Sequence, residues 1–232
     1  MSGGGDKKHI EKFNTPFMDR LRSEKPLLFI PIAMDGVVPY NECVEWVKSV
    51  FVPLGINGIE MWTDLKNKKL TELSDFSALY IGGGNTFSLL KNIRESGFDE
   101  LLKAYIEEGG TVFGSSAGAI ILGEGIGTCA HLDENGVGLK DFTGLSLAHG
   151  NSVWCHYSPE DDVLIERYIF SNGNPVLALS EKTGAILEGG IITVTGTLPA
   201  FQFHQKGEGV MRQRIEPNEA VNFLKGAGSG ML

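Results

Sequence analysis

Cysteine is scarce in this sequence, and the few cysteines present are scattered. Cys43, Cys129 and Cys155 lie far apart and form no Cys-x-x-Cys pair. A disulfide framework or a structural zinc site would need more cysteines at closer spacing. We therefore expect reduced thiols, as in a cytoplasmic protein, and we expect no metal and no other cofactor.

Long apolar segments are also missing. No uninterrupted apolar run approaches the ~20 residues that are needed to cross a bilayer. Residues 1–9 are polar, whereas a signal peptide would carry an apolar stretch. The sequence thus predicts a soluble, cytoplasmic protein that does not insert into membranes.

Basic residues are outnumbered by acidic ones. The formal net charge is −9, and no cluster of Lys and Arg with interleaved aromatic residues offsets it locally. Such a field opposes binding to phosphate backbones, so we do not expect a nucleic acid partner. The net charge does not constrain a small substrate, because a pocket can be locally positive on an acidic protein.

What the sequence does have is apolar material in short blocks. Hydrophobic residues make up 42% of the 232 residues, which is enough for a sizeable core. Strands separated by helices predict a mainly parallel sheet covered on both faces, and hence a three-layer α/β/α fold. The predicted strands of this part are 27–33, 56–62, 78–81 and 111–113, and the predicted helices are 40–51, 87–95, 98–108 and 117–122.

The rest of the chain breaks this alternation once and then resumes it. Residues 123–150 are Gly-rich and polar, which predicts an irregular segment over the site. We divide the chain into a flexible lead-in, 1–25, and a single α/β domain, 26–232. The later predicted elements are strands 153–156 and 176–180, a helix over 159–170, a hairpin over 185–195 and a closing helix over 216–224.

Residues 114–118 (Gly-Ser-Ser-Ala-Gly) have the Gly-x-Ser-x-Gly pattern of a nucleophile elbow. In such a turn the glycines permit a strained backbone, and the serine hydroxyl projects clear of the sheet. An apolar strand precedes the pattern and a helix-compatible segment follows it, so the context fits. Ser116 is therefore the candidate nucleophile, and the alternative is a Gly/Ser-rich turn without chemistry.

A second glycine-rich turn, residues 82–86 (Gly-Gly-Gly-Asn-Thr), follows another predicted strand. Its glycines allow backbone N–H groups to approach a ligand closely. A dinucleotide site is excluded because Phe87 stands where the third glycine belongs, and a Walker loop is excluded because no Gly-Lys-Ser/Thr occurs. The turn is either structural or half of an oxyanion hole at the carboxyl edge of the sheet.

A serine nucleophile needs a base, and histidine is the usual one. His156 ends an apolar strand just before a helix, which suits a rigid base. His204 is the rival, because Ser116, Glu181 and His204 follow the Ser, acid, His order of α/β-hydrolases. The remaining histidines are His9, which we expect on the surface of the lead-in, and His131 and His149, which flank the irregular segment.

Taken together, these motifs resemble the dipeptidase E and cyanophycinase family of serine peptidases. The resemblance is carried by residues 80–91 (Tyr-Ile-Gly-Gly-Gly-Asn-Thr-Phe-Ser-Leu-Leu-Lys) and 114–119 (Gly-Ser-Ser-Ala-Gly-Ala), spaced as in the family. Weaker similarity extends from the first strand to about residue 195. The resemblance implies a fold like that of class I glutamine amidotransferases, a flavodoxin-like, mainly parallel sheet between helical layers.

The resemblance also implies a role for each candidate residue. It favours His156 over His204 as the base, and it suggests Glu181 as the acid that orients the imidazole. Asp133 or Glu134 is the alternative for that third role. The implied nucleophile is Ser116, and the implied oxyanion hole consists of the N–H groups of Gly84 and Ala117.

The substrate implied by the resemblance is a small peptide, with Asp-Xaa dipeptides as the first expectation. Cyanophycinase-like hydrolysis of β-aspartyl links is the enzymatic alternative, and a non-catalytic binding module is the alternative from another class. Binding an aspartyl carboxylate needs a cation in the pocket. The candidate cations are Lys140, Arg167, His131 and His149.

Two departures from dipeptidase E border the expected substrate site. Ser115 replaces an aromatic residue directly before the nucleophile, and Trp154-Cys155 replaces Asn-Pro directly before the histidine. The fold and the nucleophile therefore transfer from the family more firmly than the aspartyl specificity does. For the assembly we expect a monomer or a homodimer.

Overall fold

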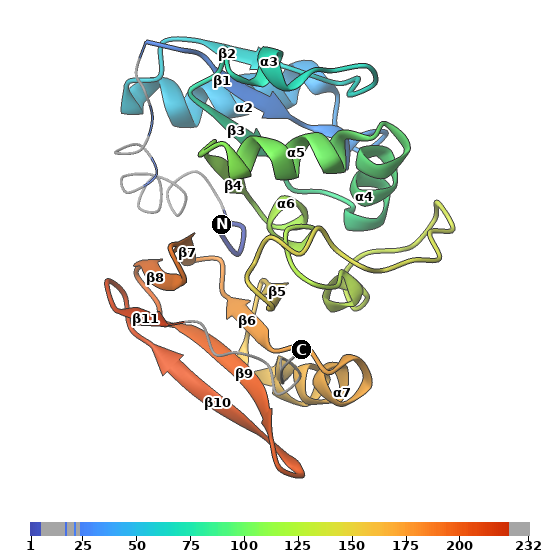
Figure 1. Cartoon of the computed structure of the whole chain (residues 1–232), viewed down its shortest axis with the longest axis vertical. Helices are drawn as coiled ribbons and strands as arrows, with labels where there is room; N and C mark the ends of the chain where they lie inside the picture. Colours follow the sequence, from blue (N-terminus) through green and yellow to red (C-terminus); the bar gives the residue numbers. More distant parts are fainter. Residues whose placement is uncertain (6–16, 18–20, 22–23, 223–232) are drawn as a thin grey trace.

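The first half of the chain forms a four-stranded parallel sheet in the order β2-β1-β3-β4 (Figure 1). The structure, a computed structural model, describes residues 1–5, 17, 21 and 24–222. β1 and β3 are four-residue apolar runs that are buried throughout, as expected for strands covered on both faces. The strands are β1 Leu27–Ile30, β2 Ile59–Met61, β3 Ala78–Ile81 and β4 Val112–Gly114.

Two apolar clusters cover the two faces of this sheet. Because side chains alternate along a strand, Phe29 and Tyr80 face one cluster with the apolar side of α2, whereas Leu28 and Leu79 face the other with α4 and α5. This arrangement confirms the predicted covering of the sheet by helices. The helices are α2 Tyr40–Phe51, α3 Leu70–Leu73, α4 Thr86–Glu95, α5 Phe98–Glu107 and α6 Ala117–Ile120.

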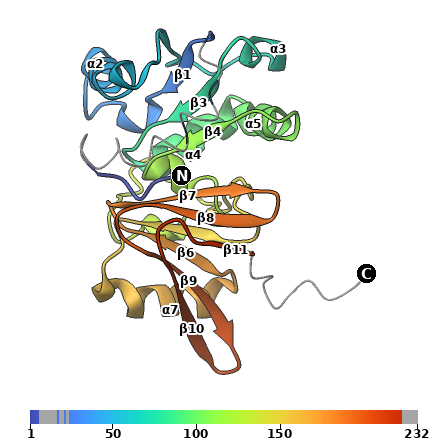
Figure 2. The ribbon, with the colours of Figure 1, turned by 90° about the vertical axis from the view of Figure 1, so that its left-hand side faces the viewer.

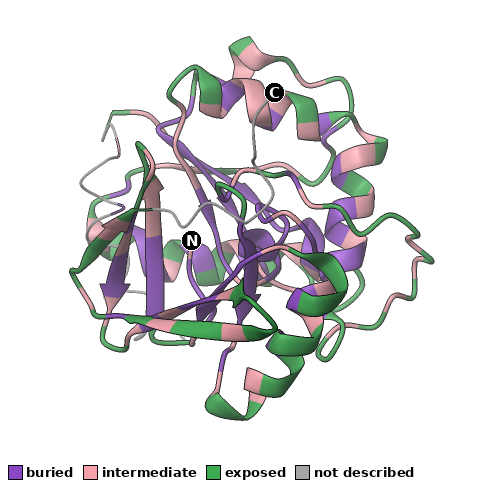
Figure 3. Cartoon of the chain, turned by 60° about the horizontal axis from the view of Figure 1, so that its bottom comes forward, coloured by how far each residue is buried: buried purple, intermediate pink, exposed green. Residues whose placement is uncertain are grey.

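The second half adds two further sheets (Figure 2). In the order β10-β9-β6-β5 only β5 and β6 are parallel, and the three-stranded sheet β11-β8-β7 is antiparallel. Buried residues gather on the strands, and the helices expose their outer faces (Figure 3). The elements are β5 Ser152–Cys155, α7 Asp162–Asn172, β6 Val176–Leu179, β7 Thr183–Glu188, β8 Ile191–Gly196, β9 Ala200–Lys206, β10 Gly209–Ile215 and β11 Ala220–Asn222.

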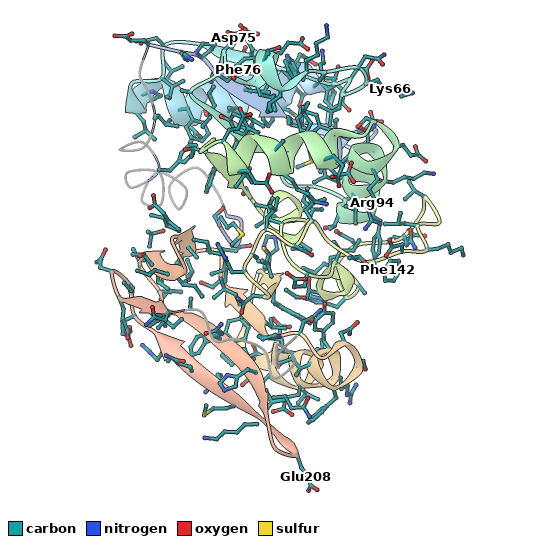
Figure 4. All side chains as sticks on the ribbon, viewed as in Figure 1. Lys66, Asp75, Phe76, Arg94, Phe142 and Glu208 are labelled. Carbon is teal, nitrogen blue, oxygen red and sulfur yellow. The ribbon has the colours of Figure 1, made fainter. Side chains whose placement is uncertain are left out.

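The irregular segment 123–150 contains a 3-10 helix, η3 Gly127–Cys129, and an isolated antiparallel bridge between Gly125 and Thr143; the rest is turns and loops, as the sequence predicts. Arg94 of α4 contacts this segment through its guanidinium, which donates to the Asp141 carbonyl at 2.9 Å and pairs with the Asp141 carboxylate at 3.2 Å. Figure 4 shows Arg94 next to the stretch that carries Phe142, whose ring packs 5.3 Å from that of Phe87. The segment is therefore fixed to α4.

The predicted closing helix over 216–224 is wrong where the structure describes it. Residues 216–219 form a turn in which Asn218 has φ of 67°, and β11 then pairs with β8. Pro217 and Asn218 favour a turn, and pairing with β8 outweighs any helical tendency of so short a segment. Residues 223 and 224 lie outside the described residues.

The hairpin of β9 and β10 was not predicted. Polar residues such as Gln202, His204 and Gln205 interrupt the apolar pattern of β9, although Gly207 between the strands is a turn signal. Pairing with β6 on one side and β10 on the other selects the strand conformation.

The first five residues do not behave as a flexible lead-in. Ser2 is fully buried, and its backbone bridges to Ser115 and to Gly184. In Figures 1 and 2 the N-terminus lies between the two halves of the molecule. Gly-rich polar sequence is compatible with a loose terminus and equally with a backbone that passes through a tight space. The division of the chain at residue 25 stays a prediction.

Candidate active site

Ser116 occupies a strained turn between β4 and α6. Its backbone has φ of 50° and ψ of −114°, a conformation that non-glycine residues rarely adopt. Gly118 makes the turn possible, because a Cβ there would lie 2.2 Å from the Ile81 carbonyl oxygen of the neighbouring strand. The Gly-x-Ser-x-Gly pattern therefore forms the elbow that the sequence predicts.

The hydroxyl of Ser116 meets the ring of His156, which directly follows β5. Ser116 Oγ and His156 Nε2 are 2.8 Å apart, a hydrogen-bond distance. On the other side of the ring, His156 Nδ1 lies 3.2 Å from Oε1 of Glu181, which follows β6. Three loops at strand ends thus bring together a hydroxyl, an imidazole and a carboxylate, with the imidazole in contact with the other two groups.

The glycine-rich turn after β3 lies against the elbow. A Cβ at Gly83 would lie 3.2 Å from Ser116 Cβ, so the two turns are in contact. Asn85 fixes the turn, because its N–H donates to the Ala33 carbonyl at 2.7 Å and its side chain caps α4 by accepting from the Ser88 N–H at 2.9 Å.

The Gly84 and Ala117 N–H groups are available to a ligand. The Ala117 N–H is the first of α6 and has no acceptor within that helix. Among the described residues, neither group has a hydrogen-bond acceptor. The N–H of Ser116 is occupied, because it donates to the Ser2 carbonyl at 3.1 Å.

A cavity of about 790 Å³ opens beside Ser116 and His156. Its far wall comes from the region of α2, which contributes Met34, Val38 and Trp46, and its near wall comes from the irregular segment. The lining carboxylates are Glu42, Asp133 and Glu134. Among the described residues the lining includes no Lys and no Arg.

Asp133 does not contact the imidazole. Its carboxylate accepts from the Thr86 N–H at 2.8 Å, at the N-terminus of α4, and the side chain of Glu134 is exposed. The acid that reaches His156 in this structure is Glu181.

The rival base and the candidate cations lie elsewhere. His204 is on β9, where burial and the charge of Lys206 lower its pKa, and it does not line the cavity. His9 lies outside the described residues. The predicted cations all lie off the cavity wall: His131 stacks on Trp154, His149 borders a separate cavity of about 370 Å³, and Lys140 and Arg167 are exposed.

Trp154 and Cys155 do not border the cavity, contrary to the expectation from the sequence. Trp154 packs among the residues next to α7, and its ring N–H donates to Asp161 at 3.3 Å. Cys155 is buried, and this burial raises the pKa of its thiol far above the ordinary value. Alternation along β5 places Trp154 and Cys155 on opposite faces of the strand, and His156 lies beyond its end with a positive φ of 56°, so its ring does not follow the direction of either.

Sequence reasoning missed the N-terminal glycines as part of the site. Gly4 and Gly5 line the cavity, and Gly4 lies against the His156 ring. The run of glycines was the available signal, but glycine runs are as common in loose termini. The apolar wall from α2 was also missed, because a helix face that is half exposed, such as Trp46 at 38%, has the pattern of an ordinary surface helix.

Comparison with known proteins places this chain in a family. The model of peptidase family S51 matches residues 1–195, a stretch that contains all the residues of the site described above. The chain belongs to peptidase family S51. Membership of S51 agrees with the enzyme class expected from the sequence.

Proteins similar to the chain carry more specific names. The chain is 33% identical to peptidase E of Haemophilus influenzae over 105 residues, which is 45% of this chain and 46% of that protein. It is 27% identical to a probable alpha-aspartyl dipeptidase of Drosophila melanogaster over 210 residues, 86% of this chain and 83% of that protein. The chain thus spans about half the length of the Haemophilus relative that it matches.

A solved structure has the same fold as this S51 chain. A putative peptidase E from Listeria monocytogenes covers 93% of this chain with 96% of its own, at a TM-score of 0.61 and 22% identity. At that identity the likeness concerns the fold alone. It confirms the predicted α/β class with a parallel central sheet.

Within the described residues, no helix combines the length and apolar character needed to span a bilayer.

Proposed function

We propose that this chain is a serine peptidase that cleaves short peptides with Ser116, His156 and Glu181. The observation that supports the proposal most directly is the 2.8 Å contact between Ser116 Oγ and His156 Nε2 at a strained elbow. Backbone strain of this kind persists only when the surroundings enforce it, and it concentrates at functional sites.

In the proposed reaction His156 Nε2 takes the proton of Ser116 as Oγ attacks the peptide carbonyl. The N–H groups of Gly84 and Ala117 donate to the oxyanion that develops. Glu181 accepts from His156 Nδ1–H and stabilises the imidazolium. The imidazolium then protonates the departing amine, and a water molecule, activated by the same base, releases the acyl group from Ser116.

The size of the cavity limits the substrate to a short peptide. Its volume of about 790 Å³ lies within the range of roughly 300–1,000 Å³ that is typical of small-molecule sites. Cys129, Leu132 and Asp133 of the irregular segment form one wall. A long folded chain would collide with this wall, so we propose an exopeptidase or dipeptidase activity. We propose the cytoplasm as its location.

Asp-Xaa dipeptides are the first substrate candidate, because the Drosophila relative is named an alpha-aspartyl dipeptidase. Cyanophycinase-like cleavage of β-aspartyl links presents a related carboxylate to the same pocket. Both need a cation near the cavity. The described lining instead carries the carboxylates of Glu42, Asp133 and Glu134.

Peptides that begin with an apolar residue are the second substrate candidate, and the lining of the cavity favours them. Met34, Val38 and Trp46 offer an apolar wall, and the carboxylates would attract the ammonium group at a free peptide N-terminus. A carboxylate on the first residue of the substrate would be repelled by the same groups.

Two measurements test the proposal. A fluorophosphonate probe should label Ser116 in the folded protein, and an unreactive folded protein would favour the binding module. A panel of Asp-Leu, Asn-Leu and Leu-Leu then ranks the substrates. Cleavage of Asp-Leu at least about tenfold faster than Asn-Leu, which corresponds to ~1.4 kcal/mol, would establish aspartyl specificity. Fastest cleavage of Leu-Leu would establish the apolar alternative.

A further inference from the structure

Residues 2–4 form a short extended segment, here called the strap, between the two halves of the molecule. The Ser2 N–H donates to the Gly114 carbonyl of β4 at 2.9 Å, and the Gly3 N–H donates to the Thr183 carbonyl of β7 at 3.1 Å. β4 is an edge strand of the first sheet, and β5 is an edge strand of the second. The strap thus joins the part of the fold that carries Ser116 to the part that carries His156.

The strap bonds directly to the backbone of both residues. The Ser2 carbonyl accepts from the Ser116 N–H, and the Gly3 carbonyl accepts from the His156 N–H, each at 3.1 Å. Both acceptor bonds reach residues with positive φ, 50° at Ser116 and 56° at His156. Conformations of this kind cost free energy, so an outside partner that holds the backbone is expected.

The strap also contacts the imidazole ring. A Cβ at Gly4 would lie 2.4 Å from His156 Cε1, well inside contact distance. At the preceding residue, a Cβ at Gly3 would lie 2.2 Å from the Ser180 carbonyl oxygen, so the strap is closely packed there too. Any side chain at Gly4 must therefore displace the His156 ring or the strap itself.

We propose that the strap positions Ser116 and His156 relative to each other, with Gly4 as the residue that leaves room for the ring. The inference rests on the proposed function for the roles of the two residues. Ser116 and His156 are 40 residues apart in sequence and follow strands of different sheets. The strap, three consecutive residues near the N-terminus, bonds to the backbone of both and so fixes one relative to the other.

The test is Gly4→Ala with Gly55→Ala as the matched control. Gly4 has φ of 99° and Gly55 has φ of 96°, but a Cβ at Gly55 meets nothing within 4 Å. Both variants therefore place an alanine at a similar positive φ, and only Gly4→Ala crowds His156. The measurements are the rate of fluorophosphonate labelling at Ser116, kcat and KM on the best dipeptide, the melting temperature, and crystal structures of wild type and variant.

For Gly4→Ala we expect labelling at least about tenfold slower and kcat lower by about 100-fold, as for a misplacement near 1 Å. Gly55→Ala should have a melting temperature similar to that of Gly4→Ala, but it should be labelled at the rate of the wild type. Equal labelling rates in wild type and Gly4→Ala would overturn the positioning role while leaving the serine peptidase intact.

Absence of labelling in the wild type would instead refute the proposed function. The distance between Ser116 Oγ and His156 Nε2 in the crystal structure of Gly4→Ala would then decide the role of the strap: a distance beyond 3.5 Å supports it, and the wild-type distance overturns it.

If Gly4→Ala does not fold, Ser2→Pro tests the strap without crowding the ring. It removes the Ser2 N–H and with it the 2.9 Å bond to the Gly114 carbonyl that joins the strap to β4. Labelling of Ser116 should then slow by about fivefold, the effect of one hydrogen bond. A wild-type rate in folded Ser2→Pro would overturn the proposal.

Discussion

Ser116 and His156 share a feature that sets them apart from most of the chain. Each has a positive φ without being a glycine, and each lies within two residues of the end of a strand, β4 for Ser116 and β5 for His156. The change of chain direction just beyond each strand presents both side chains to the cavity, where a substrate can reach them. Each of these backbone conformations lowers the free energy of unfolding, and the surrounding contacts must offset that loss.

Replacing Ser116 by Ala should abolish hydrolysis and leave the fold intact, because alanine fits the same turn. Turnover should fall by a factor on the order of 10⁶ in an assay of released amino acid. Ser115→Ala is the control and should retain most activity. Near-wild-type turnover in Ser116→Ala would show that another residue is the nucleophile.

His156→Ala should cripple turnover, whereas His204→Ala should not. His156 Nε2 lies 2.8 Å from Ser116 Oγ, and His204 does not line the cavity. Glu181→Gln should cause a smaller loss than His156→Ala, because the acid orients the imidazole without reacting. Steady-state kcat of the three variants checks this order, and a reversed effect of the two histidines would refute the assignment of the base.

Among the elements, the irregular segment 123–150 depends on α4 for its position. The Arg94 side chain joins α4 to Asp141, and the pair is partly exposed, with 24% of the Arg94 side chain and 65% of the Asp141 side chain accessible. An ion pair this exposed contributes little to global stability. Its role is local, since the same segment supplies a wall of the cavity.

Arg94→Ala should therefore raise KM more than it lowers kcat, and it should lower the free energy of unfolding by less than about 1 kcal/mol. Hydrogen exchange should accelerate in residues 135–145. Arg214→Ala is the control, because Arg214 of β10 forms an exposed ion pair with Glu216 and does not line the cavity. Unchanged KM and exchange in Arg94→Ala would show that the segment is held by other contacts.

For the whole molecule, the buried thiols couple stability to pH. Burial, together with the nearby Asp133 carboxylate, raises the pKa of the Cys129 thiol from 9.0 to about 12. Above pH 9 the unfolded chain releases this proton and the folded chain retains it, so the folded state is disfavoured as pH rises. The stability is complete below pH 9 and declines toward pH 12.

The urea midpoint should accordingly fall between pH 8 and pH 10.5, and Cys129→Ala should show a smaller fall. Alkylation of Cys129 and Cys155 in the folded protein should proceed only at the rate of unfolding, since each is 1% exposed. Rapid alkylation of either thiol at pH 8 without loss of structure would contradict this picture.

The local patterns of the sequence determined most of the first half of the molecule. Buried parallel strands are continuous apolar runs, so β1 and β3 were visible as such, and the elbow at Ser116 was visible because only small residues tolerate its backbone. These features depend on neighbours within a few residues. The covering of the sheet by helices followed from the same alternation.

Tertiary structure alone decided which distant groups meet. The residue patterns of the sequence did not decide whether His156 or His204 is the base. Packing brings His156 to Ser116 and Glu181 to His156. It also selected strands for β9 to β11 and placed the strap in the core. The physical reason is that pairing of edge strands and burial of a polar backbone depend on partners far away in sequence, which no local pattern encodes.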